Sequence, residues 1–502
     1  GDFYEMFFDD AKLASRELEI TLTGRECGQE ERAPMCGVPF HAANMYIAKL
    51  IEKGYKVAIC EQLEDPKQAK GIVKRDVIRV VTPGTVIEDN LLEEKKNNYI
   101  MSIYKQGIFF GVAVCDISTG DFLSTQIKET NNFIKLLDEI ARYYPAEIVV
   151  NEMLYSCQDE ISKIRERIDC YISHLEEKSF SPEAEKLISR YEFTDDKGEK
   201  IERLEDKEFV VPAINGLLEY ITQTQKMEME HINVIKVYNT TRYMSLDISA
   251  RRNLELTERM RDKGKKGTLL WVLDKTATSM GGRLLRRWIN DPLIDTDEIN
   301  GRLEAVKELK GNMILKDDVL ESLKKIFDIE RIAGKISYGN ANARDMLSLK
   351  SSVAKLPELR NLLKDVKSDR LKEIYENMDE LTDIYELIEK SIIEEPGITI
   401  TDGNIIKKGY NEEVDKLKSA STDGKTWLID LEAREKEQTG IKNLKISYNK
   451  VFGYYIEVTK SNLKMVPDRY VRKQTLTNGE RYITEELKEI ESTILRFTRE
   501  AS

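Results

Sequence analysis

The sequence predicts a multidomain protein, α/β in its first half and all-α in much of the rest, with a β-containing insert near the end. Strand-like and helix-like patterns alternate up to about residue 233, whereas helical periodicity dominates residues 235–393. A chain of 502 residues is also too long for one hydrophobic core. Charged residues make up 33% of it, and glycine (27) and proline (11) are scarce, which favours solvated helices over an all-β protein.

The first predicted domain, residues 1–86, mixes helices and strands. A helix is expected over residues 2–19, where Asp2 and Glu5 fit an N-cap and a capping box. Beyond it we expect, in order, a Gly/Pro-rich stretch at 33–41, a helix at 43–53, and strands at 56–60 and 77–81.

The second predicted domain, residues 97–233, is a small α/β unit. Apolar runs at 99–104 and 108–115 flank Lys105-Gln106-Gly107 and predict a hairpin. A helix near residues 132–142 then leads into a buried strand at 147–150.

The third predicted domain, residues 235–404, is all-α, because leucines recur at helical spacing and proline is rare. Its helices are expected to be longer than average, and Glu395-Pro396-Gly397 breaks the pattern. The last predicted domain spans residues 405–481, and a truncated helix follows it at 482–502. Within residues 405–481 we expect a helix at 405–437 and strands at 442–448, 454–458 and 466–471.

Charge distribution allows a polyanion partner only locally. The net charge of −12 argues against a protein that is basic overall. Between residues 441 and 482, however, nine basic and three acidic residues give +6, with four tyrosines interleaved. Such a surface can follow a phosphate backbone without reading sequence, although an ordinary solvated β-face remains an alternative. A second basic cluster at residues 251–287 lies in helical pattern and favours intramolecular ion pairs.

Several kinds of site are excluded or disfavoured. Gly424-Lys425-Thr426 resembles the end of a phosphate-binding loop, but Ser419 occupies the position of the required first glycine. The six cysteines form no C-x-x-C pair, so no zinc site is expected, and their use as free thiols favours a reducing, cytoplasmic setting. No apolar run is long enough for a membrane span. No Ser/His/Asp or Cys/His nucleophile constellation is recognisable, and His41 reads as structural.

Two carboxylates near a strand end leave one enzymatic alternative open. Asp116 and Asp121 flank Ser118-Thr119-Gly120, and such a pair could hold Mg²⁺ for phosphodiester cleavage. Turn chemistry explains the same residues and is favoured, because no third carboxylate supports a nuclease.

The start of the chain offers a different chemistry. In Gly1-Asp2-Phe3-Tyr4-Glu5-Met6-Phe7, an aromatic ring stands two residues before a carboxylate. A phenyl ring can push between base steps, and a carboxyl group can hydrogen-bond a base edge. Taken alone, Phe-x-Glu fits a core aromatic and a helix cap better than a base reader.

Several motifs in order move this balance, because together they resemble the MutS family of DNA mismatch recognition proteins over essentially the whole chain. The opening heptapeptide is similar to the family's Phe-x-Glu reader. The other similar segments are Pro34-Met35-Cys36-Gly37-Val38-Pro39-Phe40-His41-Ala42, Ala58-Ile59-Cys60-Glu61-Gln62, Arg79-Val80-Val81-Thr82-Pro83-Gly84-Thr85, Arg251-Arg252-Asn253-Leu254-Glu255-Leu256, Gly281-Gly282-Arg283-Leu284-Leu285-Arg286-Arg287-Trp288, Gly453-Tyr454-Tyr455-Ile456 and Arg472-Lys473-Gln474-Thr475-Leu476.

The resemblance implies a mismatch-binding domain (1–86), a ribonuclease-H-like connector (97–233), a helical core and lever (235–404), a clamp (405–481) and a returning lever helix (482–502). It implies that Phe3 stacks on a mispaired base and that Glu5 hydrogen-bonds it. The implied backbone contacts are Arg79, Lys445, Asn449, Lys450, Arg472, Lys473, Gln474 and Asn478.

The resemblance also implies partners and cofactors. These are double-stranded DNA with mismatches or small loops, a second copy of the full-length protein, and a MutL-type protein. ATP and Mg²⁺ would belong to an ATPase domain that we expect to lie outside this chain, so no catalytic residue, metal or cofactor is expected within it. We likewise expect the chain to begin inside the mismatch-binding domain. A general or branched-DNA clamp, with Phe3 merely in the core, is the main alternative.

Overall fold

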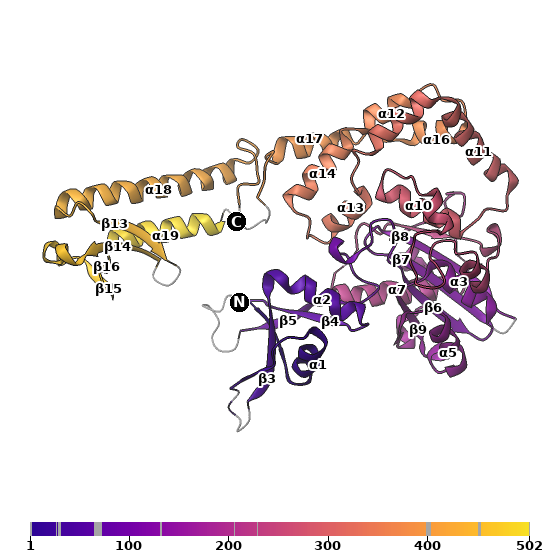
Figure 1. Cartoon of the computed structure of the whole chain (residues 1–502), viewed down its shortest axis with the longest axis horizontal. Helices are drawn as coiled ribbons and strands as arrows, with labels where there is room; N and C mark the ends of the chain where they lie inside the picture. Colours follow the sequence, from indigo (N-terminus) through magenta and orange to yellow (C-terminus); the bar gives the residue numbers. More distant parts are fainter. Residues whose placement is uncertain are drawn as a thin grey trace. The chain divides into compact units, whose positions relative to one another are not determined.

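A computed structural model describes residues 3–26, 28, 32–64, 73–130, 133–204, 206–227, 229–397, 403–449 and 453–500, without the side chains of 417, 419–425 and 493–500. The chain forms two compact units (Figure 1). The first comprises residues 1–341 and 351–380, and the second comprises residues 342–350 and 381–502.

The first unit begins with a small antiparallel sheet, here the N-terminal sheet, of order β1-β3-β2. Its strands are β1 (Phe3–Phe7), β2 (Thr23–Arg25) and β3 (Ala33–Pro39), and helices α1 (Phe8–Leu18) and α2 (Ala43–Glu52) pack against it. The core between them contains Ala11, Ala14, Leu18, Cys36, Val38 and Leu50, with Tyr4 and Met6 packed against it.

The expected helix over residues 2–19 is therefore wrong at its start. Residues 3–7 pair with β3, which lies in the stretch expected to be a Gly/Pro-rich connection, and this pairing overrides local helix propensity. Asp2, the expected cap, lies outside the described residues. The expected helix at 43–53 and strands at 56–60 and 77–81 are confirmed as α2, β4 (Val57–Gln62) and β5 (Arg75–Val81).

A seven-stranded sheet, here the central sheet, follows in the order β10-β9-β6-β7-β8-β12-β11. Strands β6, β7 and β8 are antiparallel neighbours, and the remaining pairs are parallel. The expected hairpin is confirmed as β6 and β7, and β12 carries the sheet past the expected boundary at residue 233. The bounds are β6 (Ile100–Gln106), β7 (Phe109–Asp116), β8 (Asp121–Lys128), β9 (Glu147–Asn151), β10 (Tyr171–Leu175), β11 (Glu192–Thr194) and β12 (Val234–Val237).

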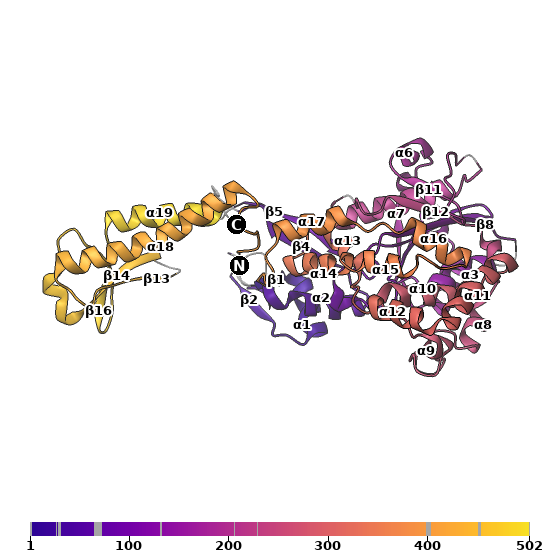
Figure 2. The same cartoon turned by 90° about the horizontal axis from the view of Figure 1, so that it is seen from above.

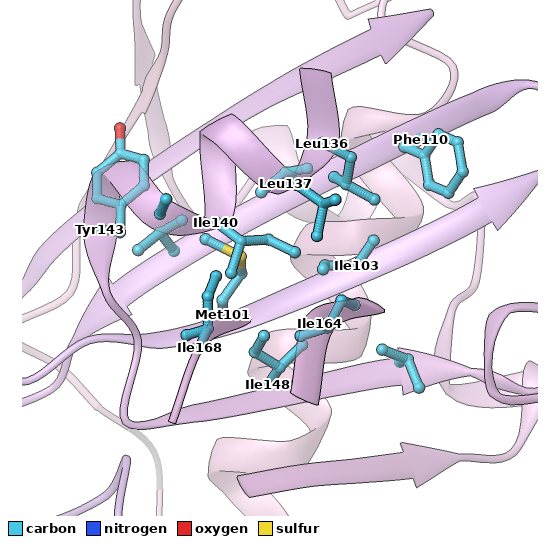
Figure 3. Packing of buried hydrophobic residues seen from close by; sticks show 14 of the residues in the cluster. Met101, Ile103, Phe110, Leu136, Leu137, Ile140, Tyr143, Ile148, Ile164 and Ile168 are labelled. Atoms are coloured by element: carbon cyan, nitrogen blue, oxygen red, sulfur yellow. The ribbon is translucent and has the colours of Figure 1, made fainter. Parts of the chain in front are cut away.

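Helices bury both faces of the central sheet. On one face, Leu136, Leu137 and Ile140 of α3 and Ile164 of α5 pack on Met101 and neighbouring strand residues (Figure 3). On the other face lie residues of α6 and α7. The helices are α3 (Ile134–Tyr143), α4 (Glu152–Tyr155), α5 (Gln158–Arg167), α6 (Ala184–Ile188) and α7 (Val210–Gln225).

The region after β12 is helical, as expected, but its described helices run only from 5 to 16 residues, so the expectation of long helices is wrong. Side-chain caps start new helices repeatedly, as at Thr268, Thr278 and Asp328, and the last two follow the end of the preceding helix closely. The helices are α8 (Ile248–Asn253), α9 (Leu269–Leu273), α10 (Ser279–Asn290), α11 (Thr296–Gly311), α12 (Met313–Leu323), α13 (Ile329–Ser337), α14 (Ala343–Val353), α15 (Leu356–Leu362), α16 (Asp369–Asn377) and α17 (Thr382–Ser391).

The second unit contains two long helices, α18 (Glu412–Thr439) and α19 (Glu485–Glu500), which lie side by side in Figures 1 and 2. Against them packs an antiparallel sheet, here the C-terminal sheet, of order β13-β14-β16-β15. Its strands are β13 (Lys445–Asn449), β14 (Gly453–Thr459), β15 (Val471–Thr475) and β16 (Gly479–Ile483).

Two of the three strands expected in this sheet are confirmed as β13 and β14. The strand expected at 466–471 is wrong, because the third strand begins only at Val471 and a 3-10 helix (Lys460–Met465) fills the connection. Strand β16 was not expected. The domain boundaries inferred from the sequence remain predictions. Among the described helices, none has the length and apolar character needed to cross a membrane.

Candidate nucleic-acid interface

Strand β1 presents alternate side chains to the core and to solvent. Tyr4 and Met6 pack into the core below the N-terminal sheet, whereas Phe3 and Glu5 share the opposite face because side chains alternate along a strand. Phe3 is 58% exposed, so its ring is not a core residue. We call Phe3 and Glu5 the recognition pair, after the role that the resemblance implies for them: they are an apolar ring and a carboxylate two residues apart on an open surface.

Gly37 forms the floor beneath this recognition pair. It lies directly opposite Glu5 on β3, and a Cβ added there would lie 3.6 Å from Phe3 Cδ1 and 3.9 Å from Glu5 Cγ. The same Cβ would lie 3.2 Å from the carbonyl oxygen of Tyr4, a tight contact with backbone. A side chain at residue 37 would therefore touch both members of the pair and press on the backbone of β1.

The core side of β1 is anchored by a half-buried hydrogen bond. Tyr4 Oη donates to Glu61 Oε1 on β4. Burial of the phenol, and then this bond to a carboxylate, raise the pKa of Tyr4 well above its usual value. The strand that carries the recognition pair is thereby tied to the second layer of its own domain.

Within the described part of the chain, the carboxylate of the pair has one polar partner. Arg25 Nη1 on β2 donates to Glu5 Oε2 at 2.7 Å. Since β3 separates β1 from β2, this ion pair joins the two outer strands of the N-terminal sheet. Glu5 thus makes an ion pair and takes no part in the expected capping box.

Basic and amide side chains line the C-terminal sheet, where the sequence predicts backbone contacts. Lys445 and Asn449 lie on β13, and Arg472, Lys473 and Gln474 lie on β15, with Asn478 in the turn that follows. Strands β13 and β15 are opposite edges of the sheet, so these residues border it on two sides and form no single patch. Lys445, Arg472, Lys473 and Asn478 are exposed. Lys450 lies outside the described residues.

Two of these side chains are partly engaged within the sheet. Arg472 Nη1 lies 3.4 Å from Glu480 Oε1, and Gln474 accepts a hydrogen bond from Arg481 at 2.8 Å. The Arg472 side chain is still 63% exposed, so its ion pair holds it only weakly. A β-bulge at Lys473 breaks the register of the pairing with β16.

Comparison with known proteins decides the family. Residues 1–90 match MutS domain I, residues 98–233 match MutS domain II, and residues 249–499 match MutS domain III. The chain belongs to the MutS family.

Curated relatives of the chain agree with this. It is 56% identical over 497 residues to a protein of Acetivibrio thermocellus and to one of Ruminiclostridium cellulolyticum, both named DNA mismatch repair protein MutS. A protein of the same name from Caldanaerobacter subterraneus subsp. tengcongensis is 52% identical over 495 residues. Each alignment covers 99% of this chain and 56% of the relative, so the chain spans about half the length of these MutS proteins.

Arg79 does not fit the backbone contact that was predicted for it. Its side chain is only 15% exposed, and it bonds Glu88 at 2.5 Å and Gln225 at 2.9 Å. A guanidinium whose donors are used inside the fold is not available to a phosphate. Arg79 instead links β5 to α7 of the second MutS domain.

The nuclease alternative at Asp116 is not supported, because the oxygens of this carboxylate are already occupied by hydrogen bonds within the protein. Asp116 is fully buried, with Ser118 donating twice to Oδ1 and Asn97 and Asn98 donating to Oδ2. Asp121 bonds Arg287 and Tyr99. Both carboxylates are therefore structural, and no group of three or more metal-ligating side chains occurs among the described residues.

Two other interpretations are confirmed. Residues 419–426 lie inside α18, so Gly424-Lys425-Thr426 is not a phosphate-binding loop. The basic cluster at 251–287 is used internally, since Arg283 pairs with Asp328 and Glu330, and Arg251 bonds the carbonyl oxygens of Leu246 and Asn290.

The sequence reasoning missed Arg25 and Gly37. Neither residue stands out locally, because their roles depend on β3 bringing residues 5, 25 and 37 into one sheet. The sequence did contain one signal, the similarity of residues 34–42 to the MutS mismatch-binding domain. That similarity points to the segment that forms β3, but it does not show which strands pair with it.

Proposed function

We propose that this chain binds double-stranded DNA and recognises mismatches or small loops in it. The observation that carries the proposal is the exposed ring of Phe3 beside Glu5 on the open face of the N-terminal sheet. The ring stacks on one mispaired base from the minor groove, and the carboxylate of Glu5 hydrogen-bonds that base. Names of the curated relatives support the same role.

The selectivity is a form of indirect readout. A mispaired base is already poorly stacked, so inserting a ring and kinking the duplex there costs less than at a paired step, by a difference of about a few kcal/mol. The ring of Phe3 therefore discriminates between duplexes by how easily they deform, and it depends little on the base sequence.

The C-terminal sheet supplies affinity in this proposal. Its exposed residues Lys445, Arg472, Lys473 and Asn478 contact phosphates, with Asn449 and Gln474 as weaker neighbours. Such contacts hold the duplex without reading it. The sheet acts as the clamp of the MutS architecture, and α18 and α19 serve as its arms.

The remaining assignments follow family membership. The antiparallel β6, β7 and β8 beside the parallel β9 and β10 support a ribonuclease-H-like connector, and the helices after β12 support a core and lever. The whole protein would act as a cytoplasmic homodimeric ATPase that uses ATP and Mg²⁺ and works with a MutL-type partner. The five described cysteines form no disulfide, which supports a reducing compartment.

The test is a binding titration of the full chain with two labelled duplexes that differ only in one G·T mismatch. Phe3→Ala should abolish the preference for the mismatched duplex while leaving binding to the paired duplex unchanged. Phe8→Ala is the matched control, because Phe8 is 60% exposed and follows the same strand. A preference that survives Phe3→Ala would instead favour the general or branched-DNA clamp.

A further inference from the structure

The recognition pair brings a negative charge toward a polyanion. Glu5 lies on the face proposed to meet the duplex, where phosphates repel an unpaired carboxylate. Arg25 is the one cation that bonds it among the described residues, at 2.7 Å. The charge of the pair is thus balanced within the protein before any DNA arrives.

The geometry of the ion pair leaves part of the carboxylate for another partner. Arg25 holds Oε2, while Oε1 of Glu5 accepts no hydrogen bond from the described part of the chain. The ring of Phe3 and the stem of Glu5 both lie over Gly37, so Glu5 stands beside the ring. A guanidinium that fixes one oxygen restricts the rotation of the carboxylate and orients the other oxygen.

The stability of the free protein does not explain this contact. The side chains are 58% exposed for Arg25 and 38% exposed for Glu5, and ion pairs this exposed stabilise a fold very little. When a duplex covers the pair and excludes water, the same contact strengthens. The ion pair of Arg25 and Glu5 therefore contributes mainly when the protein is bound to DNA.

We propose that Arg25 is a positioning residue for mismatch recognition: it neutralises Glu5 and orients its carboxylate toward the mispaired base. This inference rests on the proposed function, since it assigns a role at the same site. It makes mismatch preference depend on a residue that need not touch the base. A direct phosphate contact by Arg25 is the competing explanation. It predicts an equal loss of affinity for both duplexes and a smaller salt slope.

The test is a double-mutant cycle on the full chain with matched and G·T-mismatched duplexes, using Arg25→Ala, Glu5→Ala and the double variant. If Arg25 acts through Glu5, Arg25→Ala lowers the ratio of mismatched to matched affinity by about tenfold, and it changes nothing further once Glu5 is alanine. Arg25→Lys, which keeps the charge, should restore part of the ratio. The salt dependence of binding to the matched duplex should not change.

Arg32→Ala is the charge-matched control, because Arg32 is 66% exposed, lies next to β3 and pairs with Glu26. The inference is overturned if Arg25→Ala weakens binding to both duplexes equally with a smaller salt slope, if its effect persists in the Glu5→Ala background, or if the ratio stays unchanged. Phe3→Ala and Glu5→Ala separate the two proposals. If both abolish the preference and Arg25→Ala does not, only the role of Arg25 fails; if neither does, the proposed function fails as well.

Discussion

Lys56 Nζ donates a hydrogen bond to Tyr220 Oη at 2.8 Å, and so joins the segment before β4 to helix α7 on the central sheet. Tyr220 in turn donates to Oε1 of Glu147, a carboxylate that is fully buried at the start of β9. Thr82 and Ser173 donate to the same carboxylate. This buried carboxylate has five protein partners, since the amide of Gly84 and the ammonium of Lys56 also contact it, and it connects the first MutS domain to the second.

Tyr220→Phe should destabilise the first unit by about 1–3 kcal/mol, because it removes a donor from a buried carboxylate and leaves the ring in place. Chemical denaturation monitored by tryptophan fluorescence would measure the change. Tyr55→Phe is the control, since the hydroxyl of Tyr55 makes no hydrogen bond within the described structure; equal losses from both variants would show that the Glu147 contact is not responsible.

Gly453→Ala should unfold or loosen the C-terminal sheet. Gly453 has φ of 74°, and a Cβ there would lie 1.6 Å from Glu491 Oε1, the oxygen that accepts a hydrogen bond from the amide of Tyr454. Limited proteolysis should therefore cut between β13 and β16 faster in this variant.

Gly409→Ala provides the matched comparison in the same unit. Its φ is 90°, but no atom lies within 4 Å of the added Cβ, so it carries backbone strain without the clash. If the two variants are cleaved alike, strain alone explains the effect and the contact with Glu491 does not matter.

Asp274 should make the first unit sensitive to acid. Burial raises the pKa of this carboxyl, but hydrogen bonds from Lys265, Thr276 and Lys95 lower it more, so the folded-state pKa lies well below the usual 3.8. The resulting stability is present above about pH 4 and is lost as pH falls from there toward the folded-state pKa.

Asp274→Asn should accordingly lower the melting temperature at pH 7, and it should lower it by a smaller amount at pH 3, where the loss of this stabilisation has begun. Asp369→Asn is the control, because its side chain is 99% exposed. A deficit of the same size at both pH values would contradict the role of the ionised carboxylate.

Arg472→Ala together with Lys473→Ala should weaken binding to matched and mismatched duplexes by the same factor and should reduce the salt slope by about 2, one for each lost phosphate contact. Binding titrations at several salt concentrations give both numbers. Lys408→Ala with Lys416→Ala removes the same charge from exposed positions near the start of α18. Selective loss on the mismatched duplex would argue against a backbone role.

Local patterns predicted those elements that depend on local chemistry. The hairpin of β6 and β7 was predictable because two apolar runs flank Gly107, which has φ of 62° in the turn. The helical region after β12 was predictable from leucine spacing. Its helix lengths were not predictable, because side-chain caps such as Thr278 and Asp328 begin new helices soon after the preceding ones end.

Elements that depend on distant pairing were not predictable. Residues 3–7 form a strand only because β3 lies beside them, and the left-handed φ of 53° at Phe8 then starts α1 abruptly. Strand β16 is polar in sequence and was missed, yet it lies between β14 and β15 as an inner strand. Within the recognition pair, sequence similarity supplied Phe3 and Glu5, whereas the ion pair with Arg25 exists only in the assembled sheet.

Gly37 has one consequence for the way such a site can be altered. A Cβ at residue 37 would touch both the ring and the stem of the acid, at 3.6 and 3.9 Å, so residue 37 borders two groups at once. Successively larger residues there would lift the benzyl and carboxyl groups together, in small increments. From the proposed function we therefore expect a graded series of mismatch sensitivities through a residue that need not contact the nucleic acid.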